Sequence, residues 1–152
     1  MGRSVSRLVC AMALASAIAT TVSAQAPAGP SLYKRLGGYD AIAAVTDDFI
    51  GRIATDPQLS KFFAGAGKDT QMRIRQHVVD FICNATGGPC LYVGRPMKTA
   101  HAGLGISDAD WDTSVKHLVA TLDKFKVGKQ EKDDFLAAVT SLKTDIVEKK
   151  AT

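Results

Sequence analysis

Apolar side chains recur at three- and four-residue intervals along most of the chain, which is the period of an amphipathic helix. The first long run follows Asp40, a residue type that caps helices, and stops at Asp56-Pro57, because proline disfavours a helical residue before it. Its apolar stripe consists of Ile42, Val45, Phe49 and Ile53, widened by Ile50. No stretch alternates at the two-residue period of a strand, so we expect an all-α domain.

Three further segments and one short turn show the helical period. We expect Asp69 to cap a helix that runs to about Thr86, with inward positions at Ile74, Val78, Phe81 or Ile82, and Ala85. Ser107 and Asp110 form an acidic variant of a capping box, which predicts a helix bearing Trp111, Val115, Leu118, Val119 and Leu122. One last helix after Gly128 carries Phe135, Leu136, Val139, Leu142 and Ile146. A short turn over residues 31–36 precedes them all and is stopped by Gly37-Gly38.

The helical pattern is interrupted on both sides of one histidine. Gly87-Gly88-Pro89 stops any helix, and Gly103 and Gly105 break the chain again, so His101 falls on a very short helix. A bundle built only from its own side chains gains nothing from such an opening, whereas a bulky, flat group would occupy it. The side chains available to line it are Phe49, Phe62, Phe63, Phe81, Tyr92, Met97, Ile106 and Trp111. An ordinary apolar core with a satisfied histidine is the alternative.

Residues 1–24 have the three parts of a secretory signal peptide. Arg3 and Arg7 precede an uncharged apolar run over residues 8–22, and Val22-Ser23-Ala24 provides the small residues of a cleavage site. The run is short for a membrane span, and an uncleaved anchor is the alternative. We therefore expect an exported, periplasmic protein with a flexible mature N-terminus over 25–30 and a domain over 31–150. No stable membrane insertion is expected after cleavage of the signal.

Charge and cysteine content narrow the chemistry further. Removal of residues 1–24 takes away two arginines and no acid, so the net charge of +4 becomes +2. A weakly basic, well-mixed surface does not indicate nucleic-acid binding. Cys83 and Cys90 are placed to pair in an oxidising compartment, with two free thiols as the alternative. Their spacing does not match a zinc site, and no Cys-x-x-Cys-His haem-attachment motif is present.

Five motifs follow one another in a familiar order, at residues 32–38, 48–53, 59–65, 87–89 and 92–101, and cover nearly all of the chain from Ser31 onward. Each motif alone is weak, but the ordered set is specific, and through it the chain resembles the truncated haemoglobins of the first group. The resemblance implies a two-over-two helical sandwich around a non-covalent haem b. It also implies reversible binding of a diatomic gas, namely oxygen, nitric oxide or carbon monoxide.

The resemblance assigns roles to single positions. His101 matches the proximal iron ligand, whose second ring nitrogen needs an acceptor such as a backbone carbonyl to set the tautomer. The positions that match the lining of the family's haem pocket are Phe49, Phe62, Phe63, Phe81, Tyr92, Met97 and Ile106.

Three positions depart from the family pattern. Ile50 stands where members often place a tyrosine, and Ile74 and Val78 stand where they place glutamine at one or both positions; those polar groups donate hydrogen bonds to oxygen. An ordinary hydrogen bond contributes about 0.5–1.5 kcal/mol, so the loss of one or two weakens oxygen retention by roughly threefold to over a hundredfold. A water molecule or Gln76 would restore part of this. The substitutions count against a nitric oxide dioxygenase, which needs well-held oxygen.

His77 matches a position where some members place a second, distal iron ligand and others a basic residue that contacts a haem propionate. If His77 is a distal iron ligand, the haem is six-coordinate and suits electron transfer with a redox partner protein or gated ligand binding. If His77 contacts a propionate, it is a residue at the rim of the pocket. We expect His117 to lie at the surface or between helices. The leading hypothesis is a gas-binding protein or carrier. The alternatives are a nitric oxide dioxygenase or peroxidase-like enzyme, in which His77 is the candidate acid–base group, and a haem-free interaction domain.

Overall fold

The computed structural model describes residues 29–149, which form seven α-helices and one 3₁₀ helix. In chain order these are α1 (Leu32–Arg35), α2 (Gly38–Thr55), η1 (Ser60–Phe63), α3 (Lys68–Ala85), α4 (Met97–His101), α5 (Asp108–Lys124), α6 (Lys129–Thr140) and α7 (Lys143–Ile146). No strand occurs within this range, and one isolated bridge pairs Ser107 with Lys149. The all-α prediction is therefore confirmed. The predicted signal peptide, the start of the mature tail and the Lys150 end of the domain lie outside the described residues.

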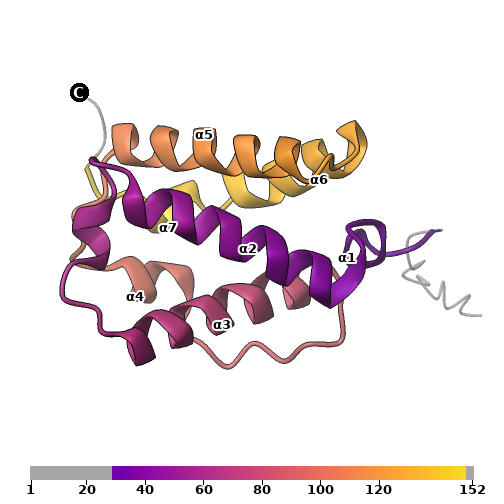
Figure 1. Cartoon of the computed structure of the whole chain (residues 1–152), viewed down its shortest axis with the longest axis horizontal. Helices are drawn as coiled ribbons and strands as arrows, with labels where there is room; N and C mark the ends of the chain where they lie inside the picture. The colour runs from indigo at the N-terminus through magenta and orange to yellow at the C-terminus, as the bar shows by residue number, and fades with distance from the viewer. Residues whose placement is uncertain (1–28, 150–152) are drawn as a thin grey trace, which may run out of the picture.

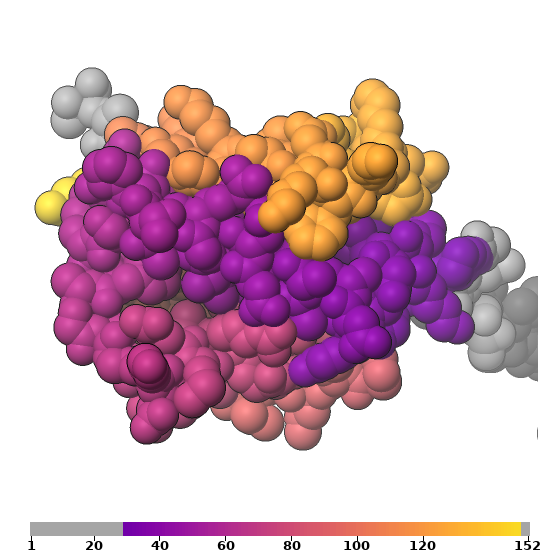
Figure 2. Space-filling view, viewed as in Figure 1, coloured from indigo at the N-terminus to yellow at the C-terminus, as the bar shows by residue number. Residues whose placement is uncertain are grey.

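The long helices form two packed pairs, as Figure 1 shows. The central helix α2 packs against α3 on one side and against α5 on the other, and side chains of α5 and α6 meet in one apolar cluster. The core between the pairs is built on Leu118, Leu122 and Phe135, and the side chains of α1 and α2 close over it. This is the two-over-two sandwich. In the space-filling view, the surface is hollowed between α2 and the segment that leads into α3 (Figure 2). Within residues 29–149, no helix is both long and apolar enough to cross a bilayer.

Two predicted N-caps are wrong by a few residues. The N-cap of α2 is Gly37, whose φ of 94° lies in the left-handed region, and Asp40 lies in the first turn instead. A Cβ on Gly37 would stand 3.0 Å from that of Ala41, so glycine suits this tight junction between α1 and α2. Asp69 likewise lies in the first turn of α3, after a Gly67 N-cap. Both carboxylates still favour the helix, since they face the positive end of its dipole.

The prediction of one C-terminal helix is also wrong, because α6 ends at Thr140 and α7 is separate. Thr140 and Ser141 turn their hydroxyls back onto the carbonyls of Leu136 and Ala138, at 2.7 Å in each case. Such bonds compete with the helical ladder and bend helices. At the break, the amide of Leu142 bonds the carbonyl three residues before it, as in a 3₁₀ turn.

The buried side of α3 differs from the predicted one. Val79 and Cys83, one turn apart, are completely buried, whereas Ala85, expected to face inward, is exposed. The predicted stripe of Ile74, Val78 and Phe81 is only half-buried. Thus α3 has two apolar faces. The face that packs against the rest of the protein is centred on Val79. The half-buried stripe of Ile74, Val78 and Phe81 is free to contact a bound group.

Cys83 and Cys90 form a disulfide, with their Cα atoms 5.7 Å apart. The bridge ties the end of α3 to the loop after the Gly-Gly-Pro break. Gly88 donates its amide to the carbonyl of Cys83 at 2.7 Å, and a Cβ at Gly88 would lie 2.5 Å from the ring of Tyr33. Only glycine fits this close approach. The pairing that the sequence left open is therefore confirmed, and it anchors the start of the loop that leads to His101.

Candidate functional site

His101 is the last residue of α4 and its side chain is half-buried. The ring Nδ1 lies 2.8 Å from the backbone oxygen of Met97, one turn earlier in the same helix. A neutral imidazole that donates from Nδ1 to this carbonyl leaves the lone pair of Nε2 available for a metal. No hydrogen bond engages Nε2 among the described residues. His101 therefore has the backbone acceptor that an iron-binding histidine requires.

The turn that leads into α4 is shaped by Tyr92. The Tyr92 hydroxyl donates to the backbone oxygen of Arg95 at 2.7 Å and closes a tight turn. A Cβ at Gly94 would stand 2.3 Å from that hydroxyl, so the turn requires glycine at this position. Burial raises the pKa of Tyr92, so the phenol stays protonated and keeps donating. The turn thus sets where α4 begins, and thereby helps to set the position of His101 at the end of that helix.

Tyr92 also connects this loop to the half-buried stripe of α3. Its ring packs edge-on against Phe81, with centroids 5.1 Å apart, and against His77, with centroids 6.2 Å apart. His77 is exposed. The structure therefore brings three predicted site residues together, with His77 at the rim of the group. Gln76 does not turn inward, because its amide donates to Tyr39 and to Asp80, each at 2.9 Å.

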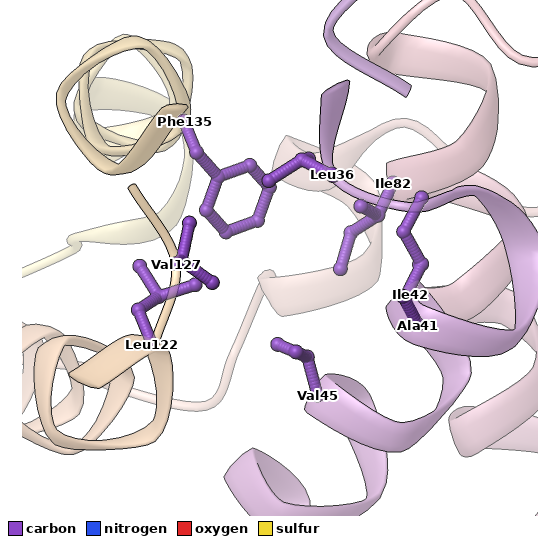
Figure 3. A pocket seen from close by; sticks show the side chains of 8 residues that line it. All are labelled: Leu36, Ala41, Ile42, Val45, Ile82, Leu122, Val127 and Phe135. Carbon is purple, nitrogen blue, oxygen red and sulfur yellow. The ribbon is translucent and has the colours of Figure 1, made fainter. Parts of the chain in front are cut away.

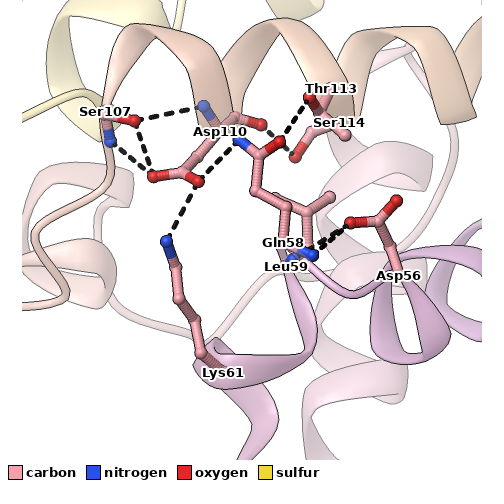
Figure 4. Close-up of polar contacts among 8 residues, drawn as sticks. All are labelled: Asp56, Gln58, Leu59, Lys61, Ser107, Asp110, Thr113 and Ser114. Carbon is pink, nitrogen blue, oxygen red and sulfur yellow. Dashed lines mark hydrogen bonds and ion pairs between the residues drawn. The ribbon is translucent and has the colours of Figure 1, made fainter.

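The predicted residues Phe62 and Phe63 are half-buried on η1, which a polar network ties to α5 (Figure 4). Asp110, 3% exposed, accepts hydrogen bonds from Gln58 at 2.9 Å and from the Lys61 ammonium at 3.1 Å. Its second oxygen accepts from the amide and hydroxyl of Ser107, which completes the predicted capping box. Burial alone would raise the pKa of Asp110, but these hydrogen bonds outweigh it and hold the pKa well below its usual range.

The rest of the η1 junction is held by Asp56. This carboxylate accepts from the amides of Gln58 and Leu59 and lies 2.9 Å from Nε2 of His117. His117 thus joins α5 to the end of α2, which confirms the expected interhelical position. The pKa of Asp56 is lowered, chiefly by His117.

A small apolar cavity of about 20 Å³ lies elsewhere, on the core side of α2 (Figure 3). That is roughly the room one water-sized molecule needs. Its lining is Leu36, Ala41, Ile42, Val45, Ile82, Leu122, Val127 and Phe135. None of the predicted site residues lines it, so it is separate from the group around His101.

The other predicted lining residues are spread over several elements. Ile50 lies half-buried on α2, and Met97 lies half-buried on α4 beside His101. Ile106, 9% exposed, lies between α4 and α5, and Trp111, 7% exposed, lies near the start of α5. Phe49 packs against the core of Leu118, Leu122 and Phe135. No motif or spacing points to Glu148, whose carboxylate bonds the segment after His101 from more than forty residues away.

The donor set suits haem iron better than a protein-held metal. Across residues 29–149, no group of three or more histidine, cysteine or acidic side chains is placed to hold a metal ion. A single histidine is enough where a porphyrin supplies the remaining nitrogen ligands. The half-buried apolar side chains of α3, η1 and α4 offer the apolar surroundings that a porphyrin needs. The residues present therefore fit a haem.

Comparisons with known proteins agree with this architecture. The bacterial-like globin family matches residues 31–148. The group 1 truncated hemoglobin GlbN of Nostoc sp. (strain MUN 8820) is 37% identical over 119 residues, covering 78% of this chain and 98% of the relative. The group 1 truncated hemoglobin LI410 of Chlamydomonas moewusii is 33% identical over 137 residues, covering 88% of this chain and 78% of the relative.

Solved structures show the same fold. The truncated hemoglobin of Tetrahymena pyriformis in its Fe(III) form superposes with a TM-score of 0.71 at 26% identity, covering 79% of this chain and all of that one. The 2/2 hemoglobin of Synechococcus sp. PCC 7002, solved in the cyanomet state with covalently attached heme, has a TM-score of 0.70 at 29% identity, covering 78% and 98%. The fold and the matches define a haem-binding globin. Within that class, the chain belongs to the group 1 truncated hemoglobins.

Proposed function

We propose that this globin holds a non-covalent haem b and reversibly binds oxygen or another diatomic gas, with Nε2 of His101 as the proximal iron ligand. The observation that carries the proposal is the 2.8 Å contact between Nδ1 of His101 and the Met97 carbonyl. It fixes the ring and directs the other nitrogen away from its own helix. The haem supplies the iron at which the gas binds.

The chain's own residues give this site its character. Phe81 and Tyr92 provide packed aromatic surface beside α3, and Ile50, Ile74 and Val78 contribute aliphatic side chains. Aliphatic groups exclude water but donate no hydrogen bond. Gln76 is already engaged on the outside with Tyr39 and Asp80. The proposed role is therefore binding or carriage of a gas rather than chemistry that needs strongly held oxygen.

Titration of the purified chain with hemin tests the proposal. We expect a Soret band that saturates at one haem per chain, and a shift of that band when carbon monoxide is added after reduction with dithionite. We expect no covalent bond between the chain and the haem, so acidified butanone should extract the haem fully. A chain that stays colourless with excess hemin would contradict the proposal.

A second candidate, a bis-histidine haem for electron transfer with a redox partner, is favoured by one observation. His77 lies against Tyr92 at the rim of the predicted pocket, on the same helix as Ile74 and Val78. If His77 binds the iron, the reduced wild type shows split low-spin bands that collapse to a broad high-spin band in His77→Ala. High-spin spectra in both proteins would make His77 a rim residue and leave an open gas-binding site.

A further inference from the structure

The C-terminal segment after α7 runs back against the residues that follow α4. The amides of Glu148 and Lys149 both donate to the carbonyl of Ile106, at 2.9 and 3.1 Å, and the amide of Asp108 donates to the carbonyl of Lys149 at 3.1 Å. In addition, α7 packs directly against α4. The end of the described chain is therefore attached to the short segment between α4 and α5.

The Glu148 carboxylate makes the most specific contact in this attachment. One oxygen accepts the amide of Gly103 at 2.7 Å, and the other accepts the amide of Gly105 at 2.5 Å. Both glycines have left-handed φ values, +82° and +66°, which turn their N–H groups toward one anionic group. These hydrogen bonds lower the pKa of Glu148, so its carboxylate stays charged at neutral pH.

The two glycines bonded by Glu148 come shortly after His101 in the chain. Gly103 is two residues after it, and the amide of Leu104 donates to the carbonyl of His101 at 3.2 Å. Helix α4 has only five residues, and Ala102 already has non-helical backbone. Such a short helix does not hold its own direction, since isolated single turns are unstable. The orientation of α4 therefore depends on the contacts at its two ends. These are the turn closed by Tyr92 before the helix and the hydrogen bonds of Glu148 to Gly103 and Gly105 after it.

We propose that Glu148 is a positioning residue for the proximal histidine. By holding Gly103 and Gly105, its carboxylate sets the tilt of α4 and hence the direction in which Nε2 of His101 points. The hydrogen bonds of the Glu148 carboxylate go to these two glycine amides, so its effect on His101 passes through them. The inference rests on the proposed function, because it takes His101 as the iron ligand.

The test compares Glu148→Ala and Glu148→Gln with a matched control, Asp145→Asn. Asp145 lies on the neighbouring α7 and is exposed, and its side chain makes no hydrogen bond or ion pair within the described range, so the control removes a nearby charge without breaking a side-chain contact. Two quantities are measured. One is the rate at which haem passes to excess apomyoglobin. The other is the frequency of the iron–histidine stretching band in the resonance Raman spectrum of the photolysed ferrous carbon monoxide complex.

We expect Glu148→Ala to lose haem about three- to tenfold faster and to shift or broaden the iron–histidine band. Glu148→Gln keeps the length and one acceptor oxygen, so its change should be smaller and in the same direction. Asp145→Asn should match the wild type. If both Glu148 variants keep the wild-type haem loss and band, the inference is wrong, even if their melting temperatures fall. A wild type that takes up no haem would contradict both the proposed function and this inference.

Discussion

Alanine at position 101 is expected to reduce hemin affinity by at least about a hundredfold, since it removes the one protein ligand that the proposed site assigns to the iron. The Met97 carbonyl that supports the ring is a hard oxygen ligand that suits haem iron poorly, so it does not replace the imidazole. A Soret titration of His101→Ala measures the loss. Free imidazole should restore the spectrum of the ferric protein, since it supplies the missing nitrogen.

The matched control for this experiment is His117→Ala. His117 bonds Asp56 between α2 and α5 and lies in another part of the fold. This variant should bind hemin as the wild type does, with a small loss of stability. If His101→Ala keeps the wild-type Soret band and affinity, His101 is not the proximal ligand.

Replacing Asp110 by alanine is expected to lower the free energy of unfolding by about 3 kcal/mol. The buried carboxylate accepts hydrogen bonds from Gln58, Lys61 and Ser107, and its removal leaves those donors without their shared partner. Urea unfolding of the haem-free chains measures the difference. Asp133→Ala, which breaks the exposed pair with Lys129, is the control and should cost less than about 1 kcal/mol.

The same carboxylate predicts an acid dependence. The pKa of Asp110 is lowered in the folded chain, so its stabilising contribution is complete above the ordinary value of 3.8 and is lost as the pH falls below it. The wild type should therefore lose stability below about pH 4, and Asp110→Ala should show a shallower loss over that range. If the free energy of unfolding falls equally steeply with decreasing pH in the two proteins, Asp110 does not carry the charged, hydrogen-bonded carboxylate described.

The sequence was sufficient for those features that depend on near neighbours. The apolar period predicted α2, α3 and α5, and Ser107 with Asp110 predicted a capping box that the structure contains. The glycine breaks placed His101 on a helix of five residues. Each of these features is decided within one or two turns of chain, where side-chain period and backbone conformation dominate.

Other predictions failed because competing local signals have similar strength. Aspartate at positions 40 and 69 is a good cap, but Gly37 and Gly67 adopt the cap conformation first, and the aspartates fall one turn inside. The split between α6 and α7 depends on Thr140 and Ser141 turning back on carbonyls, and their residue types alone do not dictate this.

The sequence by itself determined an all-α domain, its breaks, and one histidine on a short helix, because these follow from local period and backbone preference. The tertiary structure decided which face of α3 is packed, that Cys83 pairs with Cys90, and that Glu148 holds the segment after His101 from more than forty residues away. The cysteine spacing allowed the disulfide without deciding it, and the contacts of Glu148 have no period or spacing in the sequence that would predict them. The Glu148 contacts in particular exist only after α4 and the C-terminal segment have been brought together by packing against the rest of the fold.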